Sequence, residues 1–476
     1  MLKTTETHTD IFHTLFKRAS YAFSGTLVGK VSAALAGIII ARSLGVALFG
    51  TYSAIWELVL LCASITETGL TIGIQRDGAG DRKRLPELVG NALFMRMVIG
   101  AVALVIAYFF SSKISRNPLA PVIYLFLSVA SLVIILSEPL FSGMLALGRQ
   151  KTVAKFESVR GILLLLGIAI LMVLKRGVIS VVLFQAFLYL ATLIVLFYIS
   201  HRHFALSLNF SSMWHAFRTS FIYGVSSQLY SIYSRVPIVL LALLTTDKQV
   251  GYFTAAMRVV GLVQVVGGGI YSRAFVPTLF EYMKISREKF IAASGFMFAY
   301  FTLLGALVGI SFFVLAEPII LVLMGGQYHD SILVLRILSF ALFLIFANFA
   351  PDAAMTAGNK NVKKVMFQII GPVAGLLTGP FLVTRYQAAG AAYTEIVIMT
   401  ILLILFSVYS IKENFVNLRI FGQIRFPVIA IGLCGALSLA LFGHSIIPLI
   451  LVFCCSSGVI FWFWMKRNQS FLVAHN

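Results

Sequence analysis

Hydrophobic residues along this chain fall into long runs that short polar turns separate. Runs of 18 or more apolar residues recur from end to end, and about 20 residues of α-helix cross the hydrocarbon core of a bilayer. The pattern therefore predicts about fourteen membrane-spanning helices. They are expected at residues 20–42, 51–75, 91–110, 120–147, 158–174, 178–199, 220–245, 250–272, 290–315, 331–356, 365–383, 387–410, 426–442 and 446–465.

Composition agrees with this interpretation. Of the 476 residues, 60% are hydrophobic and only 11% are charged, which is far more apolar than a soluble chain of this length requires. No segment between the apolar runs is long enough to form a separate globular domain. The sequence thus predicts an all-α integral membrane protein.

The net charge of +20 would fit a nucleic-acid partner if the cations formed one patch. Instead they follow the topology. With the amino terminus inside, about 25 of the 37 Lys and Arg residues fall on one side of the membrane and about seven on the other. This asymmetry predicts that both termini are cytoplasmic, and no nucleic-acid partner is expected.

Residues that would indicate an enzyme are missing from the pattern. The four cysteines lie in apolar runs, and the eight histidines are scattered without the spacing of metal ligands. The sequence has no phosphate-binding loop, zinc-protease motif or nucleophile elbow. We expect no catalytic residue, no metal and no cofactor, while coupling of transport to H⁺ or Na⁺ stays open.

Two short segments return at similar offsets. The basic corner "ALGRQKTVAKFE" (146–157) is echoed by "TAGNKNVKKVMF" (356–367), and "LFGTYSAIWELV" (48–59) by "QVGYFTAAMRVV" (249–260). Similar composition of membrane helices is the alternative explanation. Because both echoes keep their place in the topology, we expect two six-helix lobes related by pseudo-twofold symmetry, plus two extra C-terminal helices. Such parallel repeats are typical of transporters whose lobes rock around a central site.

The expected organisation follows from these repeats. It comprises a cytoplasmic N-terminal segment (1–19), an N-lobe with helices 1–6 (20–200), a cytoplasmic linker (201–219), a C-lobe with helices 7–12 (220–410), and a cytoplasmic loop with helices 13–14 (411–476).

The stretch "IIIARSLGVALFGTYSAIWELV" (38–59) resembles the opening of polysaccharide exporters of the MOP superfamily, the O-antigen (Wzx-type) flippases. In that family an Ala-Arg-x-Leu-Gly phrase ends the first span and a Phe-Gly-x-Tyr-Ser phrase opens the second. This chain has them at 41–45 and 49–53. The corner with Ala146 and Gly148 is also similar, whereas Ala357 and Gly358 lack the intervening residue.

The resemblance implies a V-shaped lumen and an alternating-access flippase. Its substrate would be a polyprenyl-diphosphate-linked oligosaccharide of the undecaprenyl type, an O-antigen or other surface polysaccharide unit used in lipopolysaccharide biosynthesis. Transport would run from the cytoplasmic to the outer leaflet of the bacterial inner membrane, with membrane lipids and a glycan polymerase complex as further partners. A lipid II flippase and a cation-coupled multidrug exporter of the same superfamily are alternatives, and a membrane glycan polymerase or ligase is a distant one.

The seventh span, "YGVSSQLYSIYSRVP" (223–237), is too polar to face lipid. Gln228, Ser231 and Arg235 lie on one helical face. Arginine offers a planar fork of donors suited to phosphate, and the other two suit sugar hydroxyls. We expect this face to line the lumen, with a polar seam between two helices as the alternative.

Further cations lie inside the spans, where a charge is costly. Lys30 has a depth similar to that of Arg235 and lies beside a ridge of small residues that begins at Gly25 and Gly29. Together Lys30 and Arg235 would clamp a diphosphate. Arg258 and Arg336 are also expected in the lumen, unless such charges pair within the protein. Arg96 is expected to extend toward the cytoplasmic surface.

Glu57 and Arg258 occupy equivalent positions of the two repeats and carry opposite charges. We expect them to form a gating ion pair on the outer side that favours the inward-facing state, because a gate needs binding that differs between two states. The alternative is that each residue pairs within its own lobe.

The gating pair predicts a specific pattern of rescue. Glu57→Arg should impair export through like-charge repulsion, and adding Arg258→Glu should restore much of it. Export is measured as glycan at the cell surface with matched protein levels. Additive damage in the double variant would show that the two side chains never meet.

Overall fold

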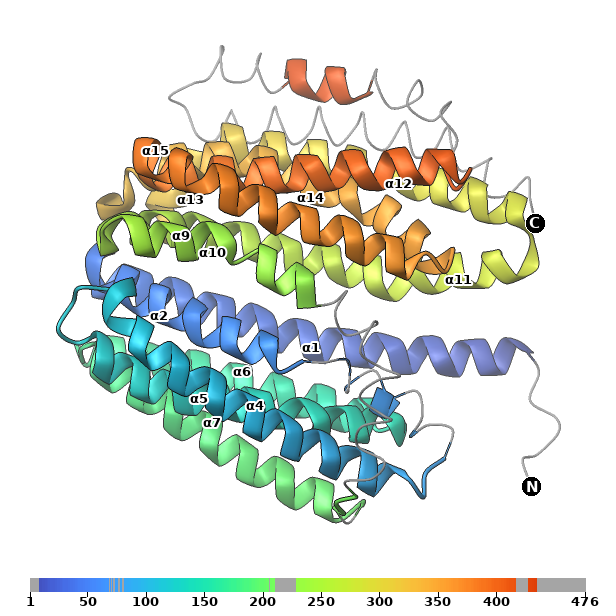
Figure 1. The fold of residues 1–476 in the computed structure, drawn as a ribbon, viewed down its shortest axis with the longest axis horizontal. Helices are drawn as coiled ribbons and strands as arrows, with labels where there is room; N and C mark the ends of the chain where they lie inside the picture. Colours follow the sequence, from blue (N-terminus) through green and yellow to red (C-terminus); the bar gives the residue numbers. More distant parts are fainter. Residues whose placement is uncertain are drawn as a thin grey trace. The chain divides into compact units, whose positions relative to one another are not determined.

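A computed structural model of the chain describes residues 8–416, apart from 68, 70, 72, 76, 77, 79, 80, 205 and 210–227, and residues 427–434 (Figure 1). All regular secondary structure in these residues is helical. Ten of the described helices are long and apolar enough to cross a membrane. The predicted all-α membrane class is therefore confirmed.

Most of the described helices overlap the predicted spans. The first half contains α1 (His8–Leu44), α2 (Val46–Ile65), α4 (Leu85–Ile114), α5 (Ala120–Ala146), α6 (Gln150–Val173) and α7 (Val178–His201). The second half contains α9 (Val236–Leu244), α10 (Asp247–Ile270), η1 (Tyr271–Phe275), α11 (Val276–Ile285), α12 (Arg287–Val314), α13 (Ala316–Leu323), η2 (Gly326–Tyr328), α14 (Ser331–Ala357) and α15 (Asn361–Lys412). Helix α2 ends ten residues before the predicted end of its span at 75, and two short helices, α11 and α13, lie outside the predicted spans. Of the last two predicted spans, only 427–434 lies within the described residues.

Contacts between residues divide the chain into two compact units. One comprises Met1–Leu44 and Ile55–Ser231, and the other Gly45–Ala54 and Ile232–Asn476. The beginning of α2 thus belongs to the second unit and the rest of that helix to the first.

Small residues bring α1 and α6 together in the first unit. A Cβ atom on Gly29 would lie 2.6 Å from the Glu157 carbonyl oxygen, and one on Gly161 would lie 2.4 Å from the Gly29 oxygen. The Ser158 hydroxyl donates a hydrogen bond to the Gly25 carbonyl at 2.7 Å. Without side chains at these points, van der Waals contact between two backbones holds the helices together, as is common in membranes. The ridge predicted on the first span is a packing surface.

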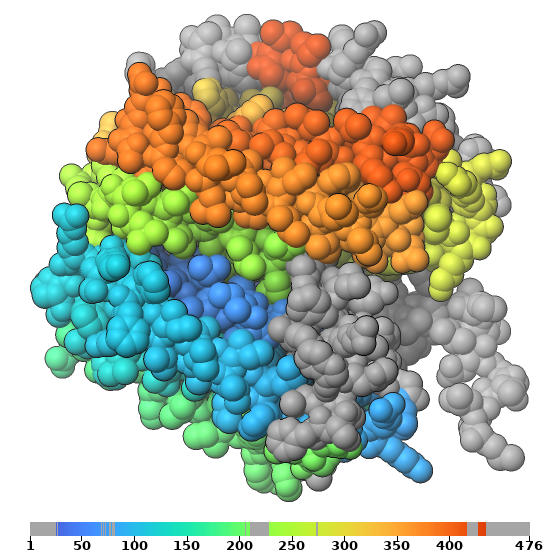
Figure 2. All heavy atoms as spheres, in the orientation of Figure 1, coloured from blue at the N-terminus to red at the C-terminus, as the bar shows by residue number. Residues whose placement is uncertain are grey.

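The second unit uses the same device within α15. Its backbone departs from helical geometry at Gln387, where φ is 51°, and the chain turns back there. Cβ atoms on Gly375 and Gly379 would meet side chains of Ile398 and Thr394. The two halves of α15 therefore pack antiparallel as two passes, which matches the separate spans predicted at 365–383 and 387–410. Side chains of α14 and α15 (orange) make up much of the second unit's face in Figure 2.

Two repeat-related glycines meet where α2 and α10 begin. A Cβ atom on Gly50 would lie 1.7 Å from the Asp247 carbonyl oxygen, and one on Gly251 would lie 2.1 Å from that of Val46. No side chain fits such distances, so only glycine allows this approach. The glycines aligned by the sequence repeat thus serve one purpose, the close crossing of the two helix starts.

Helix boundaries support the repeat further. Helix α14 begins and ends 211 positions after α5. The second residue after each helix has a left-handed backbone: Gly148 (φ 75°) after α5 and Asn359 (φ 57°) after α14. In both corners the next N–H donates to a methionine carbonyl of the last turn, at 3.0 and 2.9 Å, which is the Schellman arrangement. Asn359, and not Gly358, is thus the counterpart of Gly148. The expectation that the second corner lacks a residue is wrong.

Candidate functional site

Arg235 lies at a break in the seventh span. Residues 228–233 are helical, a turn follows at Ser234 and Arg235, and α9 begins at Val236. Pro237 in the first turn of α9 has no N–H to continue the preceding helix, which accounts for the break. Arg235 is half-buried and lies at the N-terminal end of α9. At this end of a helix the carbonyl groups already accept hydrogen bonds within the helix, whereas the first N–H groups have no partner in the helix.

The polar face before Arg235 is partly used in packing. The hydroxyl groups of Ser231 and Ser64 lie 2.8 Å apart and share a hydrogen bond. Ser231 therefore contributes to a helix–helix seam with α2, as the alternative interpretation expected. Gln228 is half-buried. Gly224, at the start of the predicted face, lies outside the described residues.

Arg258 on α10 and Arg336 on α14 are the clearest candidates for an anion site. Both are half-buried, and the Nε atom of each is fully shielded and has no hydrogen-bond partner in the described part of the chain. No carboxylate among the described residues forms an ion pair with either. A guanidinium in a membrane-spanning helix without a counter-charge is costly unless water or an anionic ligand solvates it.

The remaining candidate residues are placed on their own helices. Lys30 is exposed on α1, on a different face from the buried Gly29. Glu57 is half-buried on α2. Lys30 and Glu57 belong to the first unit, whereas Arg235 and Arg258 belong to the second. The diphosphate clamp and the gating pair stay predictions.

Arg96 does not extend to the surface as expected. It is only 3% exposed, and its Nη1 atom donates to Glu67 Oε2 at 2.5 Å and to Thr71 Oγ1 at 3.1 Å. Thr71 in turn donates to the same carboxylate oxygen at 2.7 Å. The prediction was wrong because the carboxylate of Glu67, on a neighbouring segment, forms a charge-assisted hydrogen bond with the guanidinium. This bond stabilises the arginine more than extending its side chain to water would.

A second polar cluster lies in the second unit. Lys364 Nζ is 2.7 Å from Asp352 Oδ1 and donates to Thr356 Oγ1 at 2.9 Å. The Tyr271 hydroxyl donates to Asp352 Oδ2 at 2.6 Å. Asp352 follows Pro351 inside α14, so these bonds hold α14, α15 and the π-helical turn η1 together. Asp352 and Glu67 thus both pair with cations of the protein itself.

Glu395 on the second half of α15 has a different setting. It is 2% exposed, and its Oε2 atom has no hydrogen-bond partner among the described residues. An ionised carboxylate without partners is strongly disfavoured in hydrocarbon, so this group is suited to hold a proton or a cation. No local sequence pattern distinguishes this glutamate from one that is paired.

Chemically, these surroundings separate two sets of charges. Glu67 and Asp352 form ion pairs with cations of the same unit. In contrast, Arg258 and Arg336 have N–H donors that no acid among the described residues accepts from. Among the described residues, no group of three or more His, Cys, Asp or Glu side chains gathers as metal ligands would. The arrangement favours binding of an anion over binding of a cation.

A family model described as polysaccharide biosynthesis protein matches residues 15–283, which is more than half of the chain. No curated protein matches the chain in sequence.

Solved structures share the fold across nearly the whole chain. A lipid II flippase, MurJ, in an inward closed conformation has a TM-score of 0.75 at 13% identity, covering 94% of this chain and 99% of its own. An inward-facing multidrug resistance MATE transporter of the MOP superfamily has a TM-score of 0.59 at 15% identity, covering 83% and 98%. A MOP-superfamily transporter from Pyrococcus furiosus, described as having a binding pocket of reverse polarity, has 0.57 at 14%, covering 87% and 96%.

The buried pair of Arg96 and Glu67 predicts strong coupling in stability. Arg96→Met should destabilise the protein by about 3–5 kcal/mol, because it leaves a buried carboxylate without its counter-charge. Adding Glu67→Leu should recover much of this loss. Thermal unfolding of purified protein in detergent measures the effect, and Lys113→Met, an exposed cation on the same helix, is the control. If the two single changes add up in the double variant, the pair contributes no coupling.

Proposed function

The chain belongs to the polysaccharide biosynthesis protein family of the MOP superfamily, and from this premise we propose that it flips a polyprenyl-diphosphate-linked oligosaccharide across a membrane. The cargo is an O-antigen or other surface polysaccharide unit, moved from the cytoplasmic to the outer leaflet of a bacterial inner membrane. Both termini are cytoplasmic in this proposal, in keeping with the distribution of Lys and Arg.

One observation carries the choice of substrate. Arg258 and Arg336 keep buried donor atoms without protein partners in the described chain, and a diphosphate supplies the anionic oxygens that a guanidinium binds best. A neutral sugar alone would leave this charge uncompensated. The diphosphate is therefore the part of the cargo that the protein recognises by charge.

The same observation separates the alternatives. A cation-coupled drug exporter needs a lumen that attracts cations, and two arginines without a counter-charge among the described residues, Arg258 and Arg336, oppose this. A lipid II flippase also handles a diphosphate-linked lipid, so the arginines do not distinguish it; the match to a polysaccharide biosynthesis family favours an oligosaccharide cargo. A glycan polymerase or ligase, the distant alternative, would need catalytic groups outside the membrane, and the resemblance is to transporters.

Transport proceeds by alternating access. Lys30 and Arg235 each bind a phosphate of the diphosphate. Gln228 binds a hydroxyl group of the adjoining sugar, and Ser231 binds another in the state in which its hydrogen bond to Ser64 is broken. The Glu57–Arg258 ion pair closes the outer gate until the diphosphate competes for Arg258. Coupling to H⁺ or Na⁺ involves the isolated Glu395 carboxyl, and an imposed gradient of either ion across vesicles tests it.

The diphosphate clamp is tested by removing its cations. Lys30→Ala and Arg235→Ala should each abolish export, because each loses charge-assisted bonds of about 1.5–3 kcal/mol, or about 10- to 150-fold in affinity. Arg235→Lys should rescue in part, since an ammonium cannot make the two-pronged contact. The readout is surface glycan in an export-deficient strain.

The exposed Arg116 provides the control. Arg116→Ala removes a cation from a turn between helices and should leave export unchanged. Full complementation by both Lys30→Ala and Arg235→Ala, at protein levels equal to those of the unaltered chain, would contradict the clamp.

A further inference from the structure

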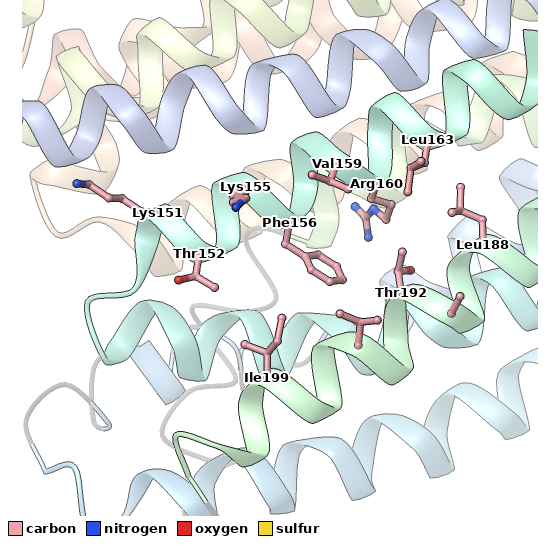
Figure 3. A pocket seen from close by; sticks show the side chains of 12 residues that line it. Lys151, Thr152, Lys155, Phe156, Val159, Arg160, Leu163, Leu188, Thr192 and Ile199 are labelled. Atoms are coloured by element: carbon pink, nitrogen blue, oxygen red, sulfur yellow. The ribbon is translucent and has the colours of Figure 1, made fainter.

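A groove between α6 and α7 in the first unit combines an apolar wall with a cationic rim. Its volume is about 620 Å³, within the range of ligand pockets. Phe156 closes its floor by packing against Phe141 of α5, with ring centroids 5.7 Å apart. Phe156 and Arg160 point from α6 into the space between the helices, and Thr192 lies opposite on α7 (Figure 3).

The walls of the groove are apolar and face outward. Val159 and Leu163 on α6 are 47% and 45% exposed, and Val195 on α7 is 48% exposed. In a chain that spans a membrane, apolar side chains on an outward face contact lipid hydrocarbon. A hollow between two such rows suits an acyl chain.

The rim carries charge of one sign. Lys151, Lys155 and Arg160 line the groove, and none of the described lining residues is acidic. From Lys151 to Arg160 the helix rises about 13 Å, and long cationic side chains reach along that distance toward the headgroup level. The Arg160 guanidinium lies 5.5 Å from the centre of the Tyr189 ring, an attraction that keeps it beside the groove.

The equivalent corner of the second unit shows what is unusual here. There Lys360 forms an ion pair with Glu413 at 3.0 Å, and Lys364 with Asp352 at 2.7 Å. Among the described residues, neither Lys155 nor Arg160 has such a carboxylate partner. The repeat therefore keeps basic residues at both corners. At the second corner two of the lysines, Lys360 and Lys364, are paired with carboxylates and Lys363 is exposed, whereas at the first corner Lys155 and Arg160 lie together beside an apolar groove.

We propose that this groove binds an anionic phospholipid of the surrounding membrane. The phosphate lies beside Lys155 and Arg160, and one acyl chain runs along Val159 and Val195. The positive-inside pattern assigns this end of the groove to the cytoplasmic leaflet, where basic side chains attract anionic lipids. The inference requires only that the chain spans a membrane, so it stands apart from the proposed transport.

Native mass spectrometry of the purified full-length protein, titrated with phosphatidylglycerol or with phosphatidylcholine of the same acyl chains, tests the proposal. The unaltered chain should prefer phosphatidylglycerol. Lys155→Gln with Arg160→Gln should weaken phosphatidylglycerol binding about 25-fold, at about fivefold per cation, and leave phosphatidylcholine binding unchanged. Lys155→Arg with Arg160→Lys keeps both charges and should retain the preference.

Two matched variants separate the groove from general surface charge. Lys363→Gln with Lys412→Gln removes two exposed cations of the second unit and should not change lipid binding. Thr192→Phe keeps every charge but fills the groove, and should weaken binding of phosphatidylglycerol.

Three results would overturn the proposal. The first is equal affinity of the unaltered chain for both phospholipids. The second is undiminished phosphatidylglycerol binding by the Lys155→Gln, Arg160→Gln variant. The third is displacement of phosphatidylglycerol from the unaltered chain by a polyprenyl diphosphate at a concentration below that of the phosphatidylglycerol. If Arg160→Gln abolishes this displacement, the groove is a site for the polyprenyl diphosphate.

Discussion

Every charge placed inside a bilayer needs a counter-charge, water or a ligand, and the few ionisable side chains in these helices meet that need in different ways. Arg96 and Lys364 each meet a carboxylate of their own unit, at 2.5 and 2.7 Å. Such pairs tie neighbouring segments together at little net gain in stability, yet breaking one is costly. They are structural, and they remove Glu67 and Asp352 from consideration as part of a transport site.

Charges left over after this pairing define what the protein can recognise. Arg258 and Arg336 have shielded Nε atoms without a described partner, so an anion is the ligand that lowers their free energy most. Glu395 is an acid whose Oε2 atom likewise has no partner among the described residues, and it is suited to bind a proton or a cation. A transporter that binds an anionic headgroup and is driven by a cation gradient needs both kinds of group, held apart on different helices.

The backbone arrangement that positions these groups depends on small residues more than on large ones. Between membrane helices there is little hydrophobic driving force, so close backbone contact provides the packing. At Gly29, which packs against α6, and at Gly50, which packs against Asp247, the backbones are so close that a methyl group does not fit. The recurrence of this solution at Gly251 links the sequence repeat to a physical requirement.

Hydropathy predicts the helices because it reflects the surrounding solvent, the lipid bilayer. Glycine spacing predicts where helices pack closely because it reflects steric limits that act locally. The partner of a charge depends on which helices pack together, and no local pattern contains that information. The sequence therefore predicts a surface position for Arg96, which instead pairs with Glu67, and it gives no sign of the hydrogen bond between Ser231 and Ser64. Asn359 was overlooked as the counterpart of Gly148 because only the backbone angle reveals its role.

Translocation of a labelled lipid across vesicles that contain the purified protein tests the central claim most directly. A fluorescent polyprenyl-diphosphate-linked oligosaccharide and a cationic dye are offered in parallel, and a membrane-impermeant quencher reports which side each occupies. A flippase for such lipids should speed transfer of the lipid-linked oligosaccharide and leave the dye on the side where it was added. Transfer of the dye without transfer of the lipid-linked oligosaccharide would contradict the proposed function.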